Sequence, residues 1–182
     1  SMNHAEEIWK TLVRATVDKK HPWRVVGFGT AGPQGPQVRS VILRGANPDE
    51  CKLVFFTDGR SQKISDLAHD PRVALLFWNA KSNTQLRVCG MASTEASELI
   101  VNSFWLRIPD YARTDYATLS APGSAIEASI PGLALETARN NFVVLNVHVE
   151  RMEMLRLDRA GHVRQLWARN VEGEWSRKDL IP

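Results

Sequence analysis

The amino-acid sequence predicts a mainly β fold with peripheral helices, an α+β arrangement built around an antiparallel β-barrel. Six to eight segments show the apolar alternation or the β-branched runs that are typical of strands. Short turns rich in Gly, Pro and Asn join most of these segments, as in antiparallel hairpins. Helical spacing is confined to the start of the chain and to two insertions, after the third and fifth strands. This order suggests a barrel with helices at its periphery.

The chain begins with a predicted helix over residues 4–20. Ile8 and Leu12 fall on one face, and the charged residues between them turn outward. Asn3 is a candidate N-cap, and Glu6 three residues later would complete a capping box. A His-Pro pair ends the helix, because the residue before a proline disfavours the α conformation.

Eight strands are predicted after this helix, each bounded by turn residues. The apolar run 73–78 is typical of a strand buried on both faces, whereas 84–92 alternates and is expected to be its antiparallel neighbour. Gly161 and Gly173 mark the turns of the last two hairpins. The predicted strands cover residues 23–30, 38–44, 53–57, 73–78, 84–92, 142–157, 163–169 and 175–180.

Two insertions interrupt the strands. Ser61 is the candidate N-cap of the first, and Ser93 or Thr94 that of the second. The second insertion is the longer, a helical and irregular segment over residues 94–142. Its stretch 107–131 contains three prolines, but also aromatic residues that favour an ordered, irregular structure over a disordered linker. The predicted helices in the insertions are 62–69, 95–106 and 133–141.

Length and composition place the chain among ordinary globular proteins. Its 182 residues suit one domain, residues 1–182, and 43% of them are hydrophobic. The net charge of +3 is small and the charges are interspersed, which argues against a nucleic-acid partner, for which a basic stripe is expected. No apolar run approaches the roughly 18 residues of a membrane span, so no membrane partner is expected.

Cysteine and histidine usage predicts neither a metal site nor disulfides. Cys51 and Cys89 form no CxxC motif, and the five histidines are scattered without metal-ligand spacing. Both cysteines are expected to remain thiols, which favours a reducing cytoplasm. We interpret Ser1 as a tag remnant before the initiator Met2, and the polar, acidic start does not resemble a signal peptide.

Cationic and hydroxyl side chains concentrate between Arg39 and Lys63, at the ends of two predicted strands. Neighbouring strands can bring such ends together, and the donors then suit a phosphate dianion beside an apolar wall for a flat ring. A helix start adds free backbone N–H groups. The pattern predicts a flavin mononucleotide (FMN) site; the simpler alternative is that the cations are solvated surface residues. The candidates are Arg39, Ser40, Arg44, Thr57, Arg60, Ser61 and Lys63.

Later strands supply further candidates. The amide of Gln85 can both donate and accept, as the uracil-like edge of a flavin requires, although an exposed strand glutamine is the simpler interpretation. His162, Arg164 and Trp167 occupy one late hairpin and are candidates to complete a pocket from one side. The alternative there is a polar hairpin with one core tryptophan.

Four motifs follow one another in a fixed order. They are RSVILRG, LVFFTDGRSQK, DPRVALLFW with TQLRVCGMA, and a final W-x-R-x-x-L-I-P. Together they resemble the pyridoxamine 5′-phosphate oxidase-like family of FMN-binding split barrels. The resemblance is strong over residues 37–93, weaker over 94–142, and returns over 142–182.

The resemblance implies a split barrel that binds FMN and forms a homodimer with the flavin at the subunit interface. It implies that Arg39, Ser61 and Lys63 hold the flavin phosphate and that Gln85 meets the polar edge of the ring. Arg164 and Trp167 would reach the flavin from the partner subunit. Lining of the ribityl chain and ring is implied for Ser40, Val41, Ile42, Phe56 and Thr57. Arg44, Arg60 and Gln62 are the remaining cofactor-binding candidates.

The substrate half of the pattern departs from the oxidase proper. Ala-Gly-His, ending at His162, stands where the oxidase has R-L-H, so the arginine is missing unless Arg159 substitutes for it. Leu155 stands where the oxidase has a flavin-covering Trp. Arg107 is the one residue kept from its substrate-phosphate set, and Arg44 replaces a Lys. The sequence therefore resembles an uncharacterised branch of the family. Arg44, Arg107 and His162 are the candidates to orient a small substrate, anionic or phosphorylated.

These features favour an FMN-dependent oxidoreductase. Hydride transfer to a flavin strictly requires no protein acid or base, so no catalytic residue is assigned. The alternatives are a flavin carrier or sensor without its own substrate, a true pyridoxamine 5′-phosphate oxidase, and a relative that binds a deazaflavin or haem. Retention of Arg39, Ser61, Lys63 and Gln85 favours FMN.

Overall fold

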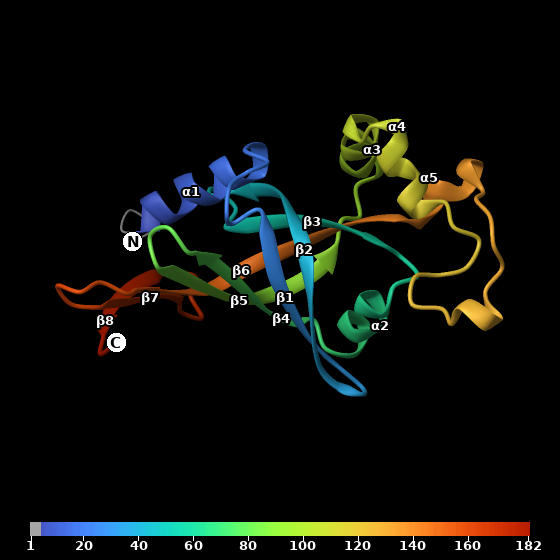
Figure 1. Cartoon of the computed structure of the whole chain (residues 1–182). Helices are drawn as coiled ribbons and strands as arrows, with labels where there is room; N and C mark the ends of the chain where they lie inside the picture. Colours follow the sequence, from blue (N-terminus) through green and yellow to red (C-terminus); the bar gives the residue numbers. More distant parts are fainter. Residues whose placement is uncertain (1–4) are drawn as a thin grey trace.

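A computed structural model describes residues 5–182 and contains a closed, six-stranded antiparallel β-barrel with two further strands and peripheral helices (Figure 1). The predicted α+β split barrel is therefore confirmed. The Asn3 N-cap and the interpretation of Ser1 and Met2 lie outside the described residues. The strands are β1 (Val25–Gly32), β2 (Gly35–Asn47), β3 (Lys52–Asp58), β4 (Arg72–Asn79), β5 (Thr84–Thr94), β6 (Phe142–Arg156), β7 (Val163–Arg169) and β8 (Trp175–Leu180).

Helices occupy three places around the barrel (Figure 1). Within residues 5–182, none of them combines the length and the apolar character that crossing a membrane would require. The α-helices are α1 (Glu6–Val17), α2 (Gln62–His69), α3 (Glu98–Arg107), α4 (Asp110–Arg113) and α5 (Ala138–Asn141), and the 3-10 helices are η2 (Thr114–Tyr116), η3 (Ile126–Ala128) and η4 (Leu135–Thr137).

The barrel closes through the pairing of β3 with β6. The sheet order is β3-β2-β1-β4-β5-β6-β7-β8, and β3 also pairs with β6, with Leu53 opposite Val147. All these pairings are antiparallel. Strands β7 and β8 extend the long strand β6 beyond the barrel, at the end opposite α3 (Figure 1).

Alternation along the strands divides the buried residues between two clusters. Inward-facing residues of all six barrel strands, among them Phe28, Phe55 and Phe77, form the main core, which α1 joins through Trp9 and Leu12. Outward-facing residues of β3 and β6 form a second cluster with α3 and the rest of the insertion: Val54, Val101, Trp105, Ala117, Ala138, Phe142 and Val144. One sheet therefore carries a packed layer on both of its faces here.

The structure shifts the predicted cap of α3. Strand β5 continues through Thr94, which pairs with Leu145, so neither Ser93 nor Thr94 is free to cap a helix. The helix starts later, and Ser97 caps it by accepting a hydrogen bond from the Ile100 N–H at 3.4 Å. The predicted boundary was therefore wrong by about one turn.

The predicted helix over residues 133–141 is also wrong in its first part. Leu133 forms an isolated β-bridge with Thr118, and the Ala134 N–H donates to the Ala117 carbonyl at 2.7 Å. These contacts hold the backbone extended, so only the 3-10 turn η4 and the single turn α5 are helical.

A close backbone approach at Gly90 gives a test of the β5–β6 pairing. A Cβ at this position would lie 2.3 Å from the His148 carbonyl oxygen, at a register shift between Cys89 and Gly90. Because that neighbour is backbone, Gly90→Ala is expected to lower the free energy of unfolding by about 1–3 kcal/mol, the usual cost of overpacking. Chemical denaturation measures this loss. The matched control Gly27→Ala, whose Cβ would meet Leu76 at an ordinary 3.5 Å, is expected to cost less; equal losses would contradict the interpretation.

Candidate functional site

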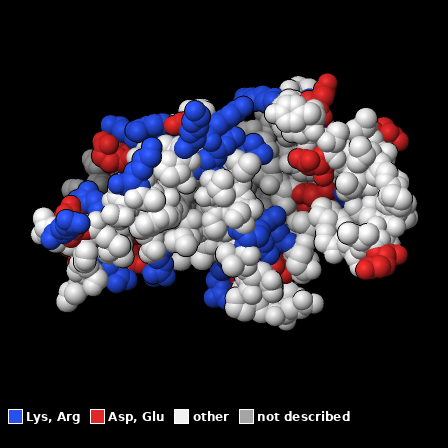
Figure 2. All heavy atoms as spheres, viewed as in Figure 1, with Lys and Arg blue, Asp and Glu red and all other residues white. Residues whose placement is uncertain are grey.

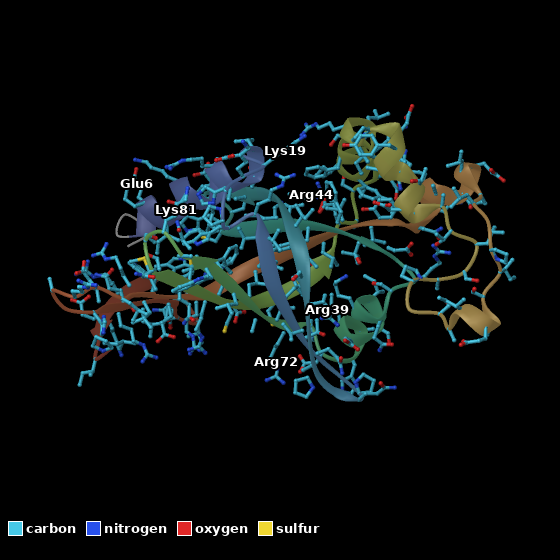
Figure 3. The ribbon with its side chains drawn as sticks, viewed as in Figure 1. Glu6, Lys19, Arg39, Arg44, Arg72 and Lys81 are labelled. Carbon is cyan, nitrogen blue, oxygen red and sulfur yellow. The ribbon has the colours of Figure 1, made fainter. Side chains whose placement is uncertain are left out.

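Donors from β2, β3 and the start of α2 meet at one end of the barrel. The Lys63 ammonium donates to Thr57 Oγ1 at 2.9 Å, and the Thr57 and Ser61 hydroxyl oxygens lie 3.2 Å apart. Arg39 lies beside α2 (Figure 3). Ser61 occupies the N-cap position of α2, but its side chain makes no capping hydrogen bond and faces Thr57 instead. We call Arg39, Thr57, Ser61 and Lys63 the donor cluster.

The charge balance of the donor cluster favours an anion. Burial, and next the positive charge of Arg39, lower the pKa of Lys63 below its ordinary value. Among residues 5–182, Lys63 has no carboxylate within ion-pair distance, and its hydrogen bond to Thr57 supplies no charge. An added dianion would offset both unfavourable effects, because its charge would stabilise the Lys63 ammonium and its oxygens would accept hydrogen bonds from Lys63 and Arg39. The cluster therefore fits a phosphate group.

Arg60 and Gln62, predicted to bind the cofactor, have other partners. Arg60 donates from Nε and Nη2 to the two carboxylate oxygens of Asp58, at 3.0 and 2.8 Å, and from Nη1 to the Thr118 carbonyl at 2.7 Å. Gln62 is exposed and donates to Asp66 Oδ1 at 3.0 Å. The structure thus assigns these two side chains to the turn and to α2, and it does not bring them into the donor cluster.

A cleft of about 530 Å³ lies near Ile42 and Arg44, at the far end of the RSVILRG segment from Arg39. It is lined by Ile42, Arg44 and Phe56 from the barrel and by Arg107 from α3, all four of which were predicted site residues. The remaining lining comes from the end of α1, the following loop and the insertion: Thr16, Lys19, Arg24, Phe104, Ile108, Pro109, Tyr111, Ala112, Asp115 and Tyr116.

Aromatic rings hold the two predicted arginines of the cleft in place. The Arg44 guanidinium lies 5.1 Å from the centre of the Phe56 ring, and that of Arg107 lies 5.7 Å from the Phe104 ring. The two rings contact each other edge to face, with centroids 5.2 Å apart. Stacking on aromatic faces leaves guanidinium edges free to donate, as anion recognition requires.

The cleft carries an excess of positive charge. Lys19, Arg24, Arg44 and Arg107 line it together with one carboxylate, Asp115. Burial is the main cause that lowers the pKa of Arg44, and Arg24 adds to the shift. Burial also raises the pKa of the neighbouring Tyr116 to about 12, so its phenol stays protonated near neutral pH and can donate a hydrogen bond. Figure 2 shows Lys and Arg atoms gathered above β2 at the end of α1, and again beside α2.

Sequence reasoning missed the contributions of Lys19, Arg24 and Tyr116 to the cleft. The first two lie on either side of the His-Pro break, where several cations occur within a few residues. Nothing in that local pattern shows which strand they face, because the packing of α1 against β2 decides it. Lys19 and Arg44 lie near one another in Figure 3, although 25 positions separate them in the sequence.

Strand order separates Gln85 from the residues on β2. In the six-stranded barrel, β5 lies three strands from β2 in both directions, so one chain does not bring Gln85 to Ile42. Gln85 is half-buried and alternates with the core residues Leu86 and Val88, which places it on the outer face of the strand. Val41 also differs from the expected lining, because its side chain packs against the barrel core.

The late hairpin corrects one prediction. Trp167 is 2% exposed, lies opposite Met152 and belongs to the main core. It cannot reach a partner's flavin, and the alternative of one core tryptophan holds. Arg164 faces outward and pairs with Glu153 at 2.7 Å, and Arg87 holds the second oxygen of that carboxylate at 2.9 Å.

His162 lies apart from the other two substrate-orienting candidates. It is exposed in the β6–β7 turn, where its Nδ1 accepts the Asp158 N–H at 3.0 Å. This turn belongs to the end of the chain that lies away from α3 (Figure 1). Within one chain, His162 therefore does not join Arg44 and Arg107.

Comparison with solved structures identifies the fold. The chain matches the pyridoxamine 5′-phosphate oxidase-related, FMN-binding protein of Nostoc punctiforme with a TM-score of 0.78 and 24% identity, over 100% of this chain and 97% of that one. It matches PhzG of Burkholderia lata, solved in complex with tetrahydrophenazine-1-carboxylic acid, with a TM-score of 0.76 and 17% identity, over 98% and 92% of the chains. At these identities the likeness shows the fold alone.

Sequence comparisons identify the family. Residues 6–95 match the family model described as pyridoxamine 5′-phosphate oxidase, FMN-binding domain. The pyridoxine/pyridoxamine 5′-phosphate oxidase of Anaeromyxobacter dehalogenans is 31% identical over 66% of each chain. That of Kineococcus radiotolerans is 44% identical over 35% of this chain and 27% of its own length, so the chain spans less than two thirds of these relatives. Residues 6–95 therefore form an FMN-binding domain of the pyridoxamine 5′-phosphate oxidase family, within a chain that has the split-barrel fold.

Proposed function

We propose that this protein is an FMN-dependent oxidoreductase that acts on a small anionic substrate. The observation that carries the proposal is the placement of two anion-binding features along one strand. Arg39 of the donor cluster and Arg44 of the cationic cleft lie five residues apart on β2, about 17 Å at roughly 3.3 Å per residue. A cofactor whose phosphate lies at the first feature would extend its ring along β2 toward the second.

The donor cluster fits the phosphate of FMN, because its two cations and two hydroxyls are close together and lack an anionic partner for Lys63. In this arrangement Arg39, Ser61 and Lys63 hold the phosphate, and Thr57 orients the Lys63 ammonium. Ser40 and Ile42, which alternate with the inward-facing Val41, present the outer face of β2 to the rest of the cofactor. Bound flavin supplies the acceptor for a hydride or electrons.

The cleft supplies recognition of the substrate. Arg44 and Arg107 are each held on an aromatic ring, and Lys19 and Arg24 add charge that the one carboxylate of the cleft does not balance. Such a surface favours a carboxylate or phosphate on a flat, apolar body. PhzG, which shares the fold, was solved with a polycyclic carboxylic acid of this general class.

A homodimer completes the proposed site. The outer face of β1, β2 and β4 exposes Val25, Val38, Leu76 and Trp78, which are 56, 76, 47 and 44% exposed. A mostly apolar groove of about 560 Å³ continues this face between β2 and β5. A second copy on this face would cover these side chains, and its Arg164 would reach the flavin.

We also propose that residues 1–182 form one domain and that the protein is cytoplasmic.

The variant Lys63→Met tests the phosphate site, because it is expected to weaken FMN binding without lowering the stability of the FMN-free protein. The variant loses charged hydrogen bonds to the phosphate, so FMN affinity is expected to fall about 10- to 100-fold, as titration of flavin fluorescence would show. The FMN-free variant should be at least as stable as the native protein, because the native ammonium is desolvated beside Arg39. The control Lys81→Met, at an exposed lysine in the β4–β5 turn, should change neither quantity. A Lys63→Met protein with native FMN affinity would contradict the assignment of the phosphate site.

The pH dependence of the same group follows from its lowered pKa. Because Lys63 binds its proton less tightly when folded, the unfolded chain holds more protons on this group between the two pKa values. The stability of the FMN-free protein should therefore rise with pH across that alkaline window, and Lys63→Met should remove this part of the dependence. Denaturation midpoints at a series of alkaline pH values would measure this rise in stability. The same change of midpoint with pH in the native protein and in Lys63→Met would contradict the role given to Lys63.

Activity requires a direct test with chosen substrates. The FMN-loaded protein is mixed anaerobically with pyridoxamine 5′-phosphate, with a polycyclic aromatic carboxylate in its reduced form, and with the uncharged analogue of each, while bleaching of the visible flavin band is followed. The charged compounds should bleach the flavin faster than their analogues. Arg107→Ala should raise KM for the active compound about tenfold or more, whereas the adjacent, exposed Leu106→Ala should not. If neither these compounds nor reduced nicotinamide bleaches the flavin, the carrier or sensor alternative is favoured.

Oligomeric state tests the proposed dimer face. Leu76→Arg places a charge in the centre of this face and is expected to convert the dimer to a monomer in light scattering after size-exclusion chromatography. Val171→Arg, at a 99% exposed position in the β7–β8 turn, serves as the control and should remain dimeric. A native protein that is monomeric at micromolar concentration, or a Leu76→Arg protein that stays dimeric, would show that this face is not the interface.

A further inference from the structure

A buried carboxylate lies directly behind the donor cluster. Asp66 projects from α2 and is 1% exposed. Its Oδ2 accepts hydrogen bonds from the Thr30 hydroxyl at 2.8 Å and from Arg39 Nη2 at 3.2 Å, and its Oδ1 accepts one from Gln62 Nε2 at 3.0 Å. These contacts, the one from Gln62 foremost, hold the pKa of Asp66 below its ordinary value, so the group is a carboxylate near neutral pH.

Gly32 of β1 leaves space for this carboxylate, because it has no side chain. A Cβ at Gly32 would lie 2.1 Å from Asp66 Oδ1 and 2.6 Å from its carboxyl carbon. Gly32 does not have a positive φ, so the need for glycine here comes from space. The Asp66 carboxylate therefore occupies space at the barrel end that a side chain at Gly32 would fill.

The contacts of Arg39 use one edge of its guanidinium. Nη1 donates to Thr30 Oγ1 at 2.7 Å and to the Phe28 carbonyl at 3.3 Å, and Nη2 donates to Asp66. A guanidinium has five N–H donors in a rigid fork. Three of them are used in this way, and the Nε–H and the second Nη2–H remain without a protein acceptor among residues 5–182. A pair of parallel donors of this kind matches a phosphate in a bidentate contact.

Charge alone does not explain why Asp66 lies here. A carboxylate next to a phosphate site repels the anion, so its electrostatic effect opposes binding. Any benefit to phosphate binding must then come from geometry, because a fixed guanidinium loses less conformational freedom when the anion binds. Thr30 contributes to the same arrangement, since its hydroxyl donates to Asp66 and accepts from Arg39.

We propose that Asp66, together with Thr30, is a positioning residue that holds Arg39 with its Nε edge toward the phosphate of FMN. This inference rests on the proposed flavin site. The N-terminal end of α2 supplies Ser61 and Lys63 to the donor cluster. The inference gives α2 a second role, which is to hold Arg39 of β2 in place through Asp66. Asp66 itself does not touch the cofactor in this arrangement.

Comparison of FMN with riboflavin tests the proposal, because riboflavin lacks the phosphate. The affinities of both ligands are measured by fluorescence titration on the full chain for the native protein and for Asp66→Asn. The variant is expected to bind FMN about tenfold more weakly and riboflavin within about twofold of native. Asp70→Asn, which changes the C-cap of the same helix, is the matched control and should alter neither affinity.

Two further variants separate positioning from folding. Thr30→Val is nearly isosteric and should reproduce the FMN-specific loss, which also covers the case that Asp66→Asn does not fold. In the double variant Arg39→Gln/Asp66→Asn, the loss should equal that of Arg39→Gln alone, because Asp66 acts through Arg39.

The outcomes that overturn the proposal are distinct. Unchanged or tighter FMN binding by both Asp66→Asn and Thr30→Val would show that the carboxylate acts only through its charge or not at all. Equal losses for FMN and riboflavin would indicate a general structural role. A native protein that binds neither ligand would overturn the proposed flavin site itself, and the inference with it.

Discussion

The pairing of β3 with β6 is the contact on which the rest of the structure depends. It runs from Lys52 opposite His148 to Asp58 opposite Phe142 and closes the barrel. Its last pair also fixes two segments that the site needs, because the turn before α2 leaves from β3 and the long insertion returns into β6. The Gly59 N–H donates to the Asn141 carbonyl at 2.7 Å, which joins the two segments directly. Barrel closure and the arrangement of the site therefore depend on the same contacts.

Strand alternation then divides functions between the two faces of the same strand. On β3, Thr57 belongs to the donor cluster, whereas its neighbour Phe56 faces the insertion and lines the cleft. On β2, a register shift between Leu43 and Gly45 leaves Arg44 out of the regular pairing with β3. Irregularities of this kind redirect side chains, and this one lies where β2 meets the cleft. A single residue of slip would exchange the two environments.

Arg60 connects the donor cluster to the cleft by another route. Its two-point contact with the buried Asp58 stiffens the turn that presents Ser61 and Lys63. The same guanidinium donates to the carbonyl of Thr118, which lies in the insertion. The segment that lines one anion-binding feature is thus held by the turn that forms the other. Arg60, which the sequence suggested as a cofactor ligand, thus joins the turn before α2 to the insertion in the folded chain.

The sequence by itself determined the strands, their antiparallel hairpins, the family motifs and all four members of the donor cluster, because these depend on alternation and on spacing within a few residues. It did not determine which cations face the cleft, since Lys19 and Arg24 reach it only through packing of α1. Nor did it show that Arg60 and Gln62 bind protein groups, that Trp167 turns inward, or that β5 lies across the barrel from β2. Those outcomes depend on contacts between residues far apart in the chain, and only barrel closure brings such residues together.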